Sequence, residues 1–200
     1  MKRFMYLSLA AVALFLHFSG FSQSNELVIP LTNAGQIGHL NVDIHAGTVN
    51  IVGTDRDDVL LKYELLEKEE EGSPTSKAAN GMTRISSGGI KLDIVEKDNV
   101  VHIDSGHGNK AVALWVEVPK DFNLNVETHH YGEVAIEKVN GEIVIDAHHG
   151  GIKAHDISGS IVANTWHGDI LVEMTGMNRE AAHALTTYHG TVDVSLPTSA

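Results

Sequence analysis

Residues 132–175 read GEVAIEKVN, GEIVIDAHH, GGIKAHDIS, GSIVANTWH and GDILVEMT, five successive units that each begin with glycine. The glycines stand at positions 132, 141, 150, 159 and 168, so the spacing is nine residues. In every unit the second and fourth residues after the glycine are apolar. Side chains two residues apart on a strand point to the same face. Each unit is therefore predicted to be one short strand with one buried face, followed by a turn.

A repeat of fixed length predicts stacked copies of one structural unit. The turns alternate in character, because Val139–Asn140 and Ile157–Ser158 differ from the histidine-containing turns at 148–149 and 166–167. The pattern resumes at 187–194, after an insertion at 178–183. One full coil then holds two units, about 18 residues. We predict an all-β fold, a right-handed β-helix or β-solenoid whose coils of about 18 residues contain two short strands each.

Residues 1–22 have the pattern of a secretory signal peptide. Lys2 and Arg3 precede an apolar run from Phe4 to Phe18, which is shorter than the roughly 20 residues that a membrane-spanning helix requires. We expect export to the periplasm, the cell surface or the medium, with no transmembrane segment after cleavage. Residues 23–200 are predicted to form a single β-solenoid domain. It comprises irregular N-terminal coils at 26–122, with a solvated loop at 67–89, and the regular repeats at 123–197.

The composition excludes several classes of partner. The sequence contains no cysteine, so neither a disulfide framework nor a lipid-modified cysteine is available. Loss of Lys2 and Arg3 with the signal peptide leaves twelve basic residues against 26 acidic ones, a net charge of −14. Nucleic acid and anionic membranes are not expected partners, because both attract basic surfaces.

Histidine is concentrated at one kind of corner. Eight of the 13 histidines lie between positions 129 and 189, and six of these eight occur at the same alternate turn. Neighbouring strands lie about 4.8 Å apart, so residues one coil apart should form columns. One column is expected to contain His149, His167 and His189. The residues that precede them, His148, Trp166 and Tyr188, should form a second column, with residues 129–131 one coil earlier.

Two interpretations of these columns remain open. In the first, the histidines are polar surface residues of the turns that were duplicated with the repeat and bind nothing. The second is a site for zinc, copper or nickel, whose bonds to imidazole nitrogen are about 2.0–2.1 Å long. The candidate ligands are His149, His167, His189, His130 and His148; no other cofactor is expected. With either interpretation, stacked rings should resist protonation because like charges repel.

No motif in the sequence predicts catalysis. A Gly-x-Ser-x-Gly elbow, a phosphate-binding glycine loop and a cysteine nucleophile are all absent from the sequence. A polysaccharide-cleaving β-helix would use clustered carboxylates on an outer face. The outward positions offer such groups, but a solubilising surface explains them equally well, and we expect a protein that is not an enzyme. The carboxylates concerned are Glu133, Glu137, Asp146, Asp169 and Glu173.

The sequence resembles a known family through the segment Thr165–Val172, which reads TWHGDILV, and through Thr187–Val194, which reads TYHGTVDV. The bacterial putative-adhesin domain family is typified by the pattern Thr-x-x-Gly-Asp-Ile-x-Val. The resemblance extends to Leu40–Gly53, which looks like the opening strand pair of that family, and to Val112–Pro119. It implies a β-helical fold and a non-catalytic role at the cell envelope. Histidine here replaces the serine or other small polar residue that is more usual in the family.

The expected partners follow from this resemblance and from the stacking. An envelope protein or a glycan is the partner that an adhesin-like protein would bind. The last predicted strand leaves an edge that solenoids normally cover with a capping element. Self-association through that edge is therefore a further expectation.

Overall fold

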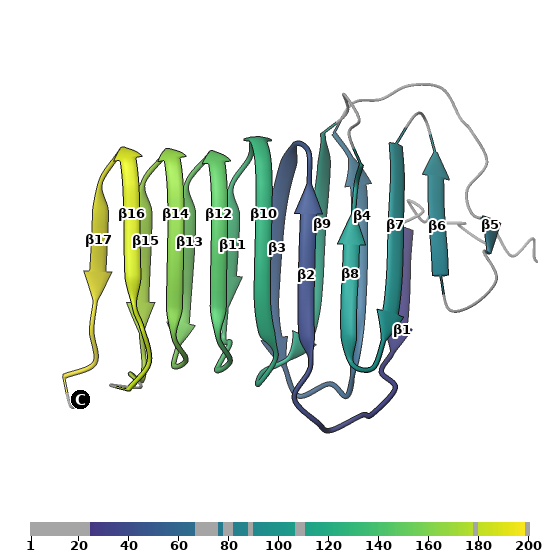
Figure 1. Ribbon diagram of the computed structural model, residues 1–200, viewed down its shortest axis with the longest axis horizontal. Helices are drawn as coiled ribbons and strands as arrows, with labels where there is room; N and C mark the ends of the chain where they lie inside the picture. The colour runs from purple at the N-terminus through teal and green to yellow at the C-terminus, as the bar shows by residue number, and fades with distance from the viewer. Residues whose placement is uncertain are drawn as a thin grey trace, which may run out of the picture.

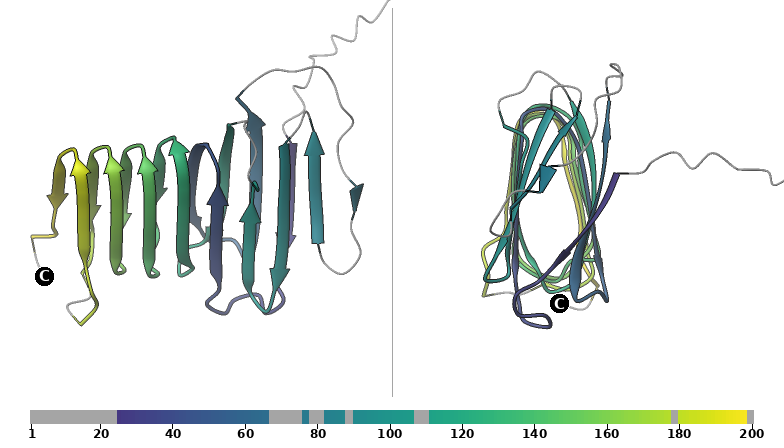
Figure 2. Two further views of the ribbon diagram at one scale, coloured as in Figure 1. Left: turned by 45° about the horizontal axis from the view of Figure 1, so that its top comes forward. Right: turned by 90° about the vertical axis from the view of Figure 1, so that its right-hand side faces the viewer.

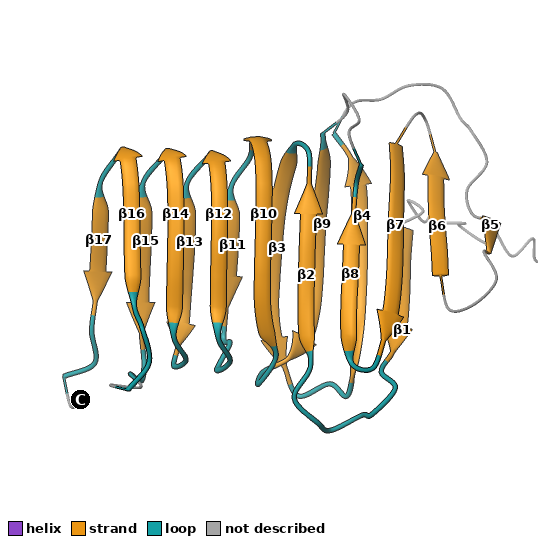
Figure 3. Ribbon diagram, viewed as in Figure 1, coloured by secondary structure: helices purple, strands orange, loops and turns teal. Residues whose placement is uncertain are grey.

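The computed structural model describes residues 25–66, 76–77, 82–87, 90–106, 111–177 and 180–198. These residues form strands and loops without any helix, as Figure 3 shows. Accordingly, the described segments contain no helix that is long and apolar enough to cross a membrane. The predicted signal peptide, residues 1–22, lies outside the described residues. The all-β prediction is confirmed.

The strands fall into two groups along the chain. Up to residue 119 they are β1 (Asn25–Pro30), β2 (His39–Ile44), β3 (Gly47–Thr54), β4 (Asp58–Leu65), β5 (Ser76–Lys77), β6 (Met82–Ser87), β7 (Ile90–Lys97), β8 (Val100–Asp104) and β9 (Val112–Pro119). The later strands are β10 (Asn123–Tyr131), β11 (Val134–Glu137), β12 (Ile143–His149), β13 (Ile152–Ile157), β14 (Ile161–His167), β15 (Ile170–Met174), β16 (Ala184–His189) and β17 (Val192–Ser195).

The repeats alternate between two sheets. Strands β10, β12, β14 and β16 are neighbours in one sheet, and β11, β13, β15 and β17 are neighbours in the other (Figure 1). All these neighbours pair in parallel. Ile143 pairs with Ile161 and Ile152 pairs with Ile170, so each strand lies beside the strand two units further along the chain.

The core lies between the two sheets. In the view along the stack in Figure 2, right panel, the repeats superimpose around a flattened interior. The apolar pair of each unit points into this interior and is buried, whereas the residues between them point outward. Burying a valine or isoleucine side chain contributes about 1.5–3 kcal/mol. The pairs are Val134 and Ile136, Ile143 and Ile145, Ile152 and Ala154, Ile161 and Ala163, and Ile170 and Val172.

The N-terminal strands do not stack in chain order. Strand β2 lies between β8 and β10, and β3 lies between β9 and β11, all in parallel. The β2–β3 unit is therefore enclosed by units that follow it in sequence. Beyond β8 and β9 the pairing becomes antiparallel, with β7 on β8, β4 on β9 and β1 on β4. Both sheets are consequently mixed, and the antiparallel strands cover the N-terminal end of the parallel stack (Figure 1).

The prediction of a loop over residues 67–89 needs correction. Strands β5 and β6 fall within it, and β6 pairs antiparallel with β7 from Met82 opposite Val95 to Ser87 opposite Ile90. The remaining residues of the predicted loop lie outside the described residues. A signal was present in the sequence, because two glycines between alternating segments are typical of a two-residue hairpin. The polar composition of 67–81 obscured it.

A column of glycines sets the distance between neighbouring repeats at one corner. Each of these glycines has a positive φ, between +124° and +158°. A Cβ atom added to Gly150 would lie 1.6 Å from the carbonyl oxygen of Gly132, and one added to Gly168 would lie 2.3 Å from that of Gly150. No side chain fits such a distance, so the backbones of successive coils meet directly. The column contains Gly47, Gly132, Gly150, Gly168 and Gly190.

Threonine and aspartate of the repeat hold the same corner together. The Thr165 hydroxyl donates to the Gly150 carbonyl at 3.0 Å, and the Thr187 hydroxyl donates to the Gly168 carbonyl at 2.9 Å. The carboxylate of Asp169 accepts from the backbone N–H of Thr191 at 2.7 Å. These bonds cross from one coil to the next, which explains why a Thr-x-x-Gly-Asp pattern suits this turn.

Substitution of one corner glycine should destabilise the stack. We expect Gly150→Ala to lower the free energy of unfolding by more than about 2 kcal/mol, because the new methyl group overlaps a carbonyl oxygen and the φ is unfavourable for alanine. The neighbouring Gly151→Ala is the control, since its added Cβ would meet nothing closer than the Asp169 carbonyl oxygen at 3.4 Å. Urea unfolding followed by circular dichroism measures both. Equal stability of the two variants would contradict the proposed role of the column.

Candidate functional site

The glycine column places the residues that precede it in register. Strands β12, β14 and β16 end at His149, His167 and His189, and each histidine is followed by a column glycine. His149 pairs with His167, and His167 pairs with His189. The backbones of neighbouring strands are held together at the glycines. The side chains of the residues that directly precede these glycines must therefore project side by side.

The three imidazole rings form one stack. The ring centroids of His149 and His167 are 4.9 Å apart with the planes 4° from parallel, and those of His167 and His189 are 4.7 Å apart at 21°. These separations match the distance between neighbouring strands. The structure therefore brings three of the five candidate ligands into a single column.

A second column of rings runs beside the first. The ring of Trp166 lies 6.2 Å from that of His148 and 4.5 Å from that of Tyr188, with the planes nearly parallel in both pairs. Trp166 is 49% exposed and Tyr188 is 66% exposed. Stacked rings cover one another's faces, so an approaching molecule meets mainly their edges, where the indole N–H, the phenol O–H and the imidazole nitrogens lie. We call the two columns together, residues 148, 149, 166, 167, 188 and 189, the aromatic corner.

His130 does not extend the histidine column. Strand β10 contains a register shift between Thr128 and Tyr131, and beyond it Tyr131 pairs with His149. The ring of His130 lies instead against that of His45, at 4.5 Å and edge-on. The 18-residue period predicts this arrangement, because Tyr131 and not His130 lies 18 residues before His149.

The stacked rings do not converge on one point. Two nitrogen atoms bound to a single ion at 2.0–2.1 Å are at most about 4.2 Å apart. Parallel imidazoles 4.7 and 4.9 Å apart exceed this limit unless a ring rotates. His148 and His149 differ, because their Nδ1 atoms are 3.0 Å apart. That pair already has a separation that one ion can bridge.

The stacking changes the acidity of the central ring. Loss of solvent contact lowers the pKa of His167 below the usual value of 6.5, and the charges of His189, His149 and His148 lower it further. The direction follows from two physical causes: the packed ring loses hydration of its charged form, and a second positive charge nearby is repelled. The central ring of the stack therefore favours the neutral form.

This pKa makes folding stability dependent on pH. The folded pKa of His167 is below the unfolded one, so its contribution is fully present above about pH 6.5 and is lost as the pH falls through the folded value. We expect the melting temperature to fall on acidification below about pH 6.5. His167→Gln should show a shallower dependence, whereas His102→Gln, at an exposed position on β8, should keep the wild-type slope. Thermal denaturation at several pH values measures this dependence. The same change of melting temperature with pH in all three proteins would contradict a contribution from His167.

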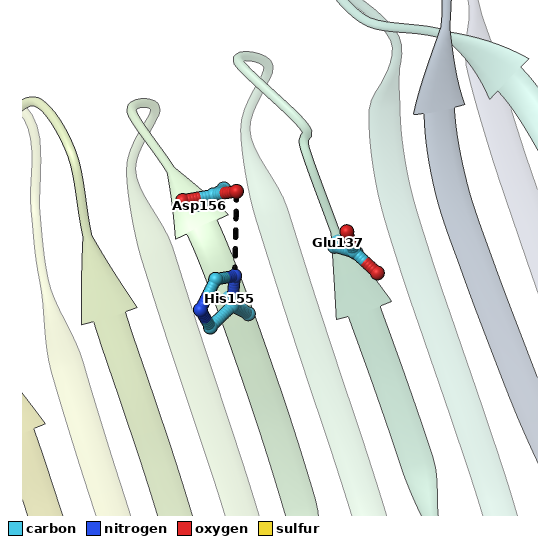
Figure 4. Close-up of side chains that lie close together, drawn as sticks. All are labelled: Glu137, His155 and Asp156. Carbon is cyan, nitrogen blue, oxygen red and sulfur yellow. Dashed lines mark ion pairs between the residues drawn. The ribbon is translucent and has the colours of Figure 1, made fainter.

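A second cluster lies on the other sheet and was missed by the sequence reasoning. Glu137 on β11 pairs with His155 on β13, and Asp156 follows directly (Figure 4). One ligand atom from each of these three residues can be chosen so that all lie within 4.8 Å of one another. The Nε2 atom of His155 is also 2.7 Å from a carboxylate oxygen of Glu173. A signal existed, because Glu137, His155 and Glu173 recur at 18-residue intervals, the length of one coil.

A local irregularity turns His155 and Asp156 to the same side. Ala154 and Ile157 are both buried, so the two residues between them face outward. The register of β13 shifts at this point, and Asp156 has a φ of 55°, which is in the left-handed region. Regular strands alternate their side chains between faces, whereas a bulge places two successive side chains on one face. The cluster depends on that bulge.

The remaining outward carboxylates have structural partners. Glu133 forms an ion pair with Lys153 at 2.7 Å, and Asp169 accepts the backbone hydrogen bond from Thr191 described above. Within the cluster itself, Glu137 is hydrogen-bonded to Lys138, which lowers the pKa of its carboxyl group. These contacts account for three of the acidic residues considered for polysaccharide cleavage without invoking catalysis.

Comparison with known proteins assigns no family. No protein-family model and no curated protein sequence matches the chain. A solved structure described as a putative cell adhesion protein from Clostridium sporogenes is similar at 12% identity, covering 86% of this chain and 99% of that one, with a TM-score of 0.48. A putative adhesin from Bacteroides fragilis is similar at 9% identity over 86% of this chain and 97% of that one, with a TM-score of 0.26.

Proposed function

We propose that the chain is a non-catalytic, adhesin-like binding protein that is exported to the cell envelope. The observation that carries the proposal is the aromatic corner, where two columns of rings continue without interruption over three coils. Exposed aromatic side chains that gather in one place are typical of binding surfaces. The signal-peptide pattern of residues 1–22 and the acidic composition support the exported location.

The proposed scaffold is a right-handed β-solenoid whose coils each contain two strands. Its support is the parallel pairing of β10, β12, β14 and β16 in one sheet and of β11, β13, β15 and β17 in the other. A solenoid presents the same group once per coil along a straight line. The aromatic corner therefore suits an extended ligand that lies along the stack, such as a glycan chain or a segment of an envelope protein.

Two tryptophans allow a matched test of this proposal. Trp166 is 49% exposed at the aromatic corner, and Trp115 is 43% exposed on β9 in the other sheet. We expect the double variant Trp166→Ala, Tyr188→Ala to bind envelope polysaccharides or envelope proteins at least about tenfold more weakly, because aromatic residues dominate binding energy. Trp115→Ala should bind as the wild type does.

The measurement is binding of soluble envelope polysaccharides and of envelope fractions to the immobilised protein. Equal retention by the corner variant and the Trp115 variant would contradict a role for the aromatic corner. The same samples are assayed for new reducing ends. Release of reducing ends by the wild type would contradict the non-catalytic part of the proposal and favour a polysaccharide-cleaving enzyme.

Binding of a transition metal at the aromatic corner is a second candidate function. The 3.0 Å separation of the His148 and His149 Nδ1 atoms favours it. Zinc, copper or nickel would be held by this pair, with His167 or His189 joining after rotation of its ring.

The second candidate is tested with a triple variant. We expect His149→Ala, His167→Ala, His189→Ala to weaken nickel or copper binding, because imidazole nitrogen is a preferred ligand of both metals. His102→Ala, which removes an exposed histidine from β8, is the control. Isothermal titration with each metal measures the affinity. An affinity that is the same in both variants would contradict metal binding at this corner.

A further inference from the structure

The cluster on β11 and β13 has chemistry that the proposed function does not use. Its side chains are brought together by the pairing of Glu137 with His155 and by the bulge at Asp156. Glu173, on the next strand of the same sheet, approaches His155 from the opposite side. The result is one imidazole ring surrounded by three carboxylates, with two of these on one side of the ring and the third on the other.

The carboxylate of Glu173 determines which nitrogen of the His155 ring is free. The Nε2 atom of His155 lies 2.7 Å from Glu173, so in the neutral ring the proton belongs on Nε2, where it is donated to that carboxylate. Nδ1 then carries a lone pair. This atom faces the Asp156 carboxylate at 3.4 Å, as the dashed line in Figure 4 marks. Two acceptors that face each other repel unless a proton or a cation lies between them.

One of these distances fits a cation. Two ligand atoms on a tetrahedral zinc ion with bonds of 2.0–2.1 Å are about 3.4 Å apart. This is the separation of His155 Nδ1 from Asp156 Oδ2. Glu137 and His155 also line a hollow of about 150 Å³, which gives access to water as a further ligand. A carboxylate bonded to the far nitrogen of a metal-binding histidine is a common arrangement, because it fixes the tautomer and raises the basicity of the ring.

We propose that His155 Nδ1, Asp156 and Glu137 bind one divalent transition-metal ion, with zinc as the best fit to the donor set. Glu173 holds the histidine ring in the binding tautomer and does not bind the ion. The Lys138 ammonium group, which is hydrogen-bonded to Glu137, competes with the metal for that carboxylate. This site is separate from the aromatic corner and does not depend on the function proposed for it.

The competing explanation is a salt-bridge network around a protonated His155. In that case the proton on Nδ1 satisfies Asp156, and the ring forms ion pairs on both sides. The two explanations predict different effects on cation binding when the charge of Lys138 is removed. Removal of its positive charge should strengthen binding of a cation at Glu137, whereas a salt-bridge network contains no cation site that could respond.

Isothermal titration with zinc chloride at about pH 7.5 tests the site. We expect one ion per chain at this cluster, apart from any ion at the aromatic corner, and its binding is lost or weakened at least about tenfold in His155→Ala and weakened about 10–100-fold in Glu173→Gln. Lys138→Gln should bind more tightly than the wild type. The triple variant of the aromatic corner should retain this binding, which separates the two candidate sites. All substituted residues lie on the surface, and unchanged circular dichroism of each variant verifies folding.

A second readout identifies the atom that binds. Nitrogen NMR of the histidine side chains should show zinc-dependent change at Nδ1 of His155, with Nε2 still protonated. Three results would overturn the proposal: no saturable zinc binding, binding that His155→Ala leaves unchanged, or a Lys138→Gln variant whose affinity equals that of the wild type. Coordination through Nε2 would overturn the assignment of Glu173.

Discussion

Contact between backbones at the glycine corner is the constraint on which the rest of the structure depends. Gly132, Gly150 and Gly168 approach the carbonyl oxygens of their neighbours so closely that no Cβ fits between them. The contact holds successive coils at the distance of paired strands, and it gives each corner the same backbone path. The buried hydroxyl of Thr165 and the carboxylate of Asp169 then bond across the coils in a way that only this path permits.

The same constraint gives the surface its character. Residues next to a backbone that is held in place cannot move apart. The imidazole rings of His149, His167 and His189 therefore stack even where stacking does not stabilise them. The pKa of His167 is lowered by this enforced proximity, first through lost solvent contact and then through the charges of the neighbouring imidazoles. Ring edges rather than faces are left for a ligand. A corner that repeats along the stack thus presents a line of ring edges, which is the surface that we propose binds the ligand.

The two clusters of possible ligands differ in how regular their backbones are. At the aromatic corner, regularity keeps imidazole rings parallel and prevents them from converging. On the other sheet, an interruption of regularity brings His155 and Asp156 to one face, where Glu137 and Glu173 from neighbouring coils meet them. Regular repeats therefore favour extended recognition, and local bulges favour compact sites.

The sequence by itself determined the nine-residue unit, the buried pair in each unit and the column of His149, His167 and His189, because these follow from the local period of side chains along a strand. Only the tertiary structure decided the rest. His130 lies against His45, which is far from it in the sequence, and β2 and β3 are enclosed by strands that follow them in the chain. Strand neighbours are chosen by hydrogen bonding between distant segments, and no local period encodes that choice.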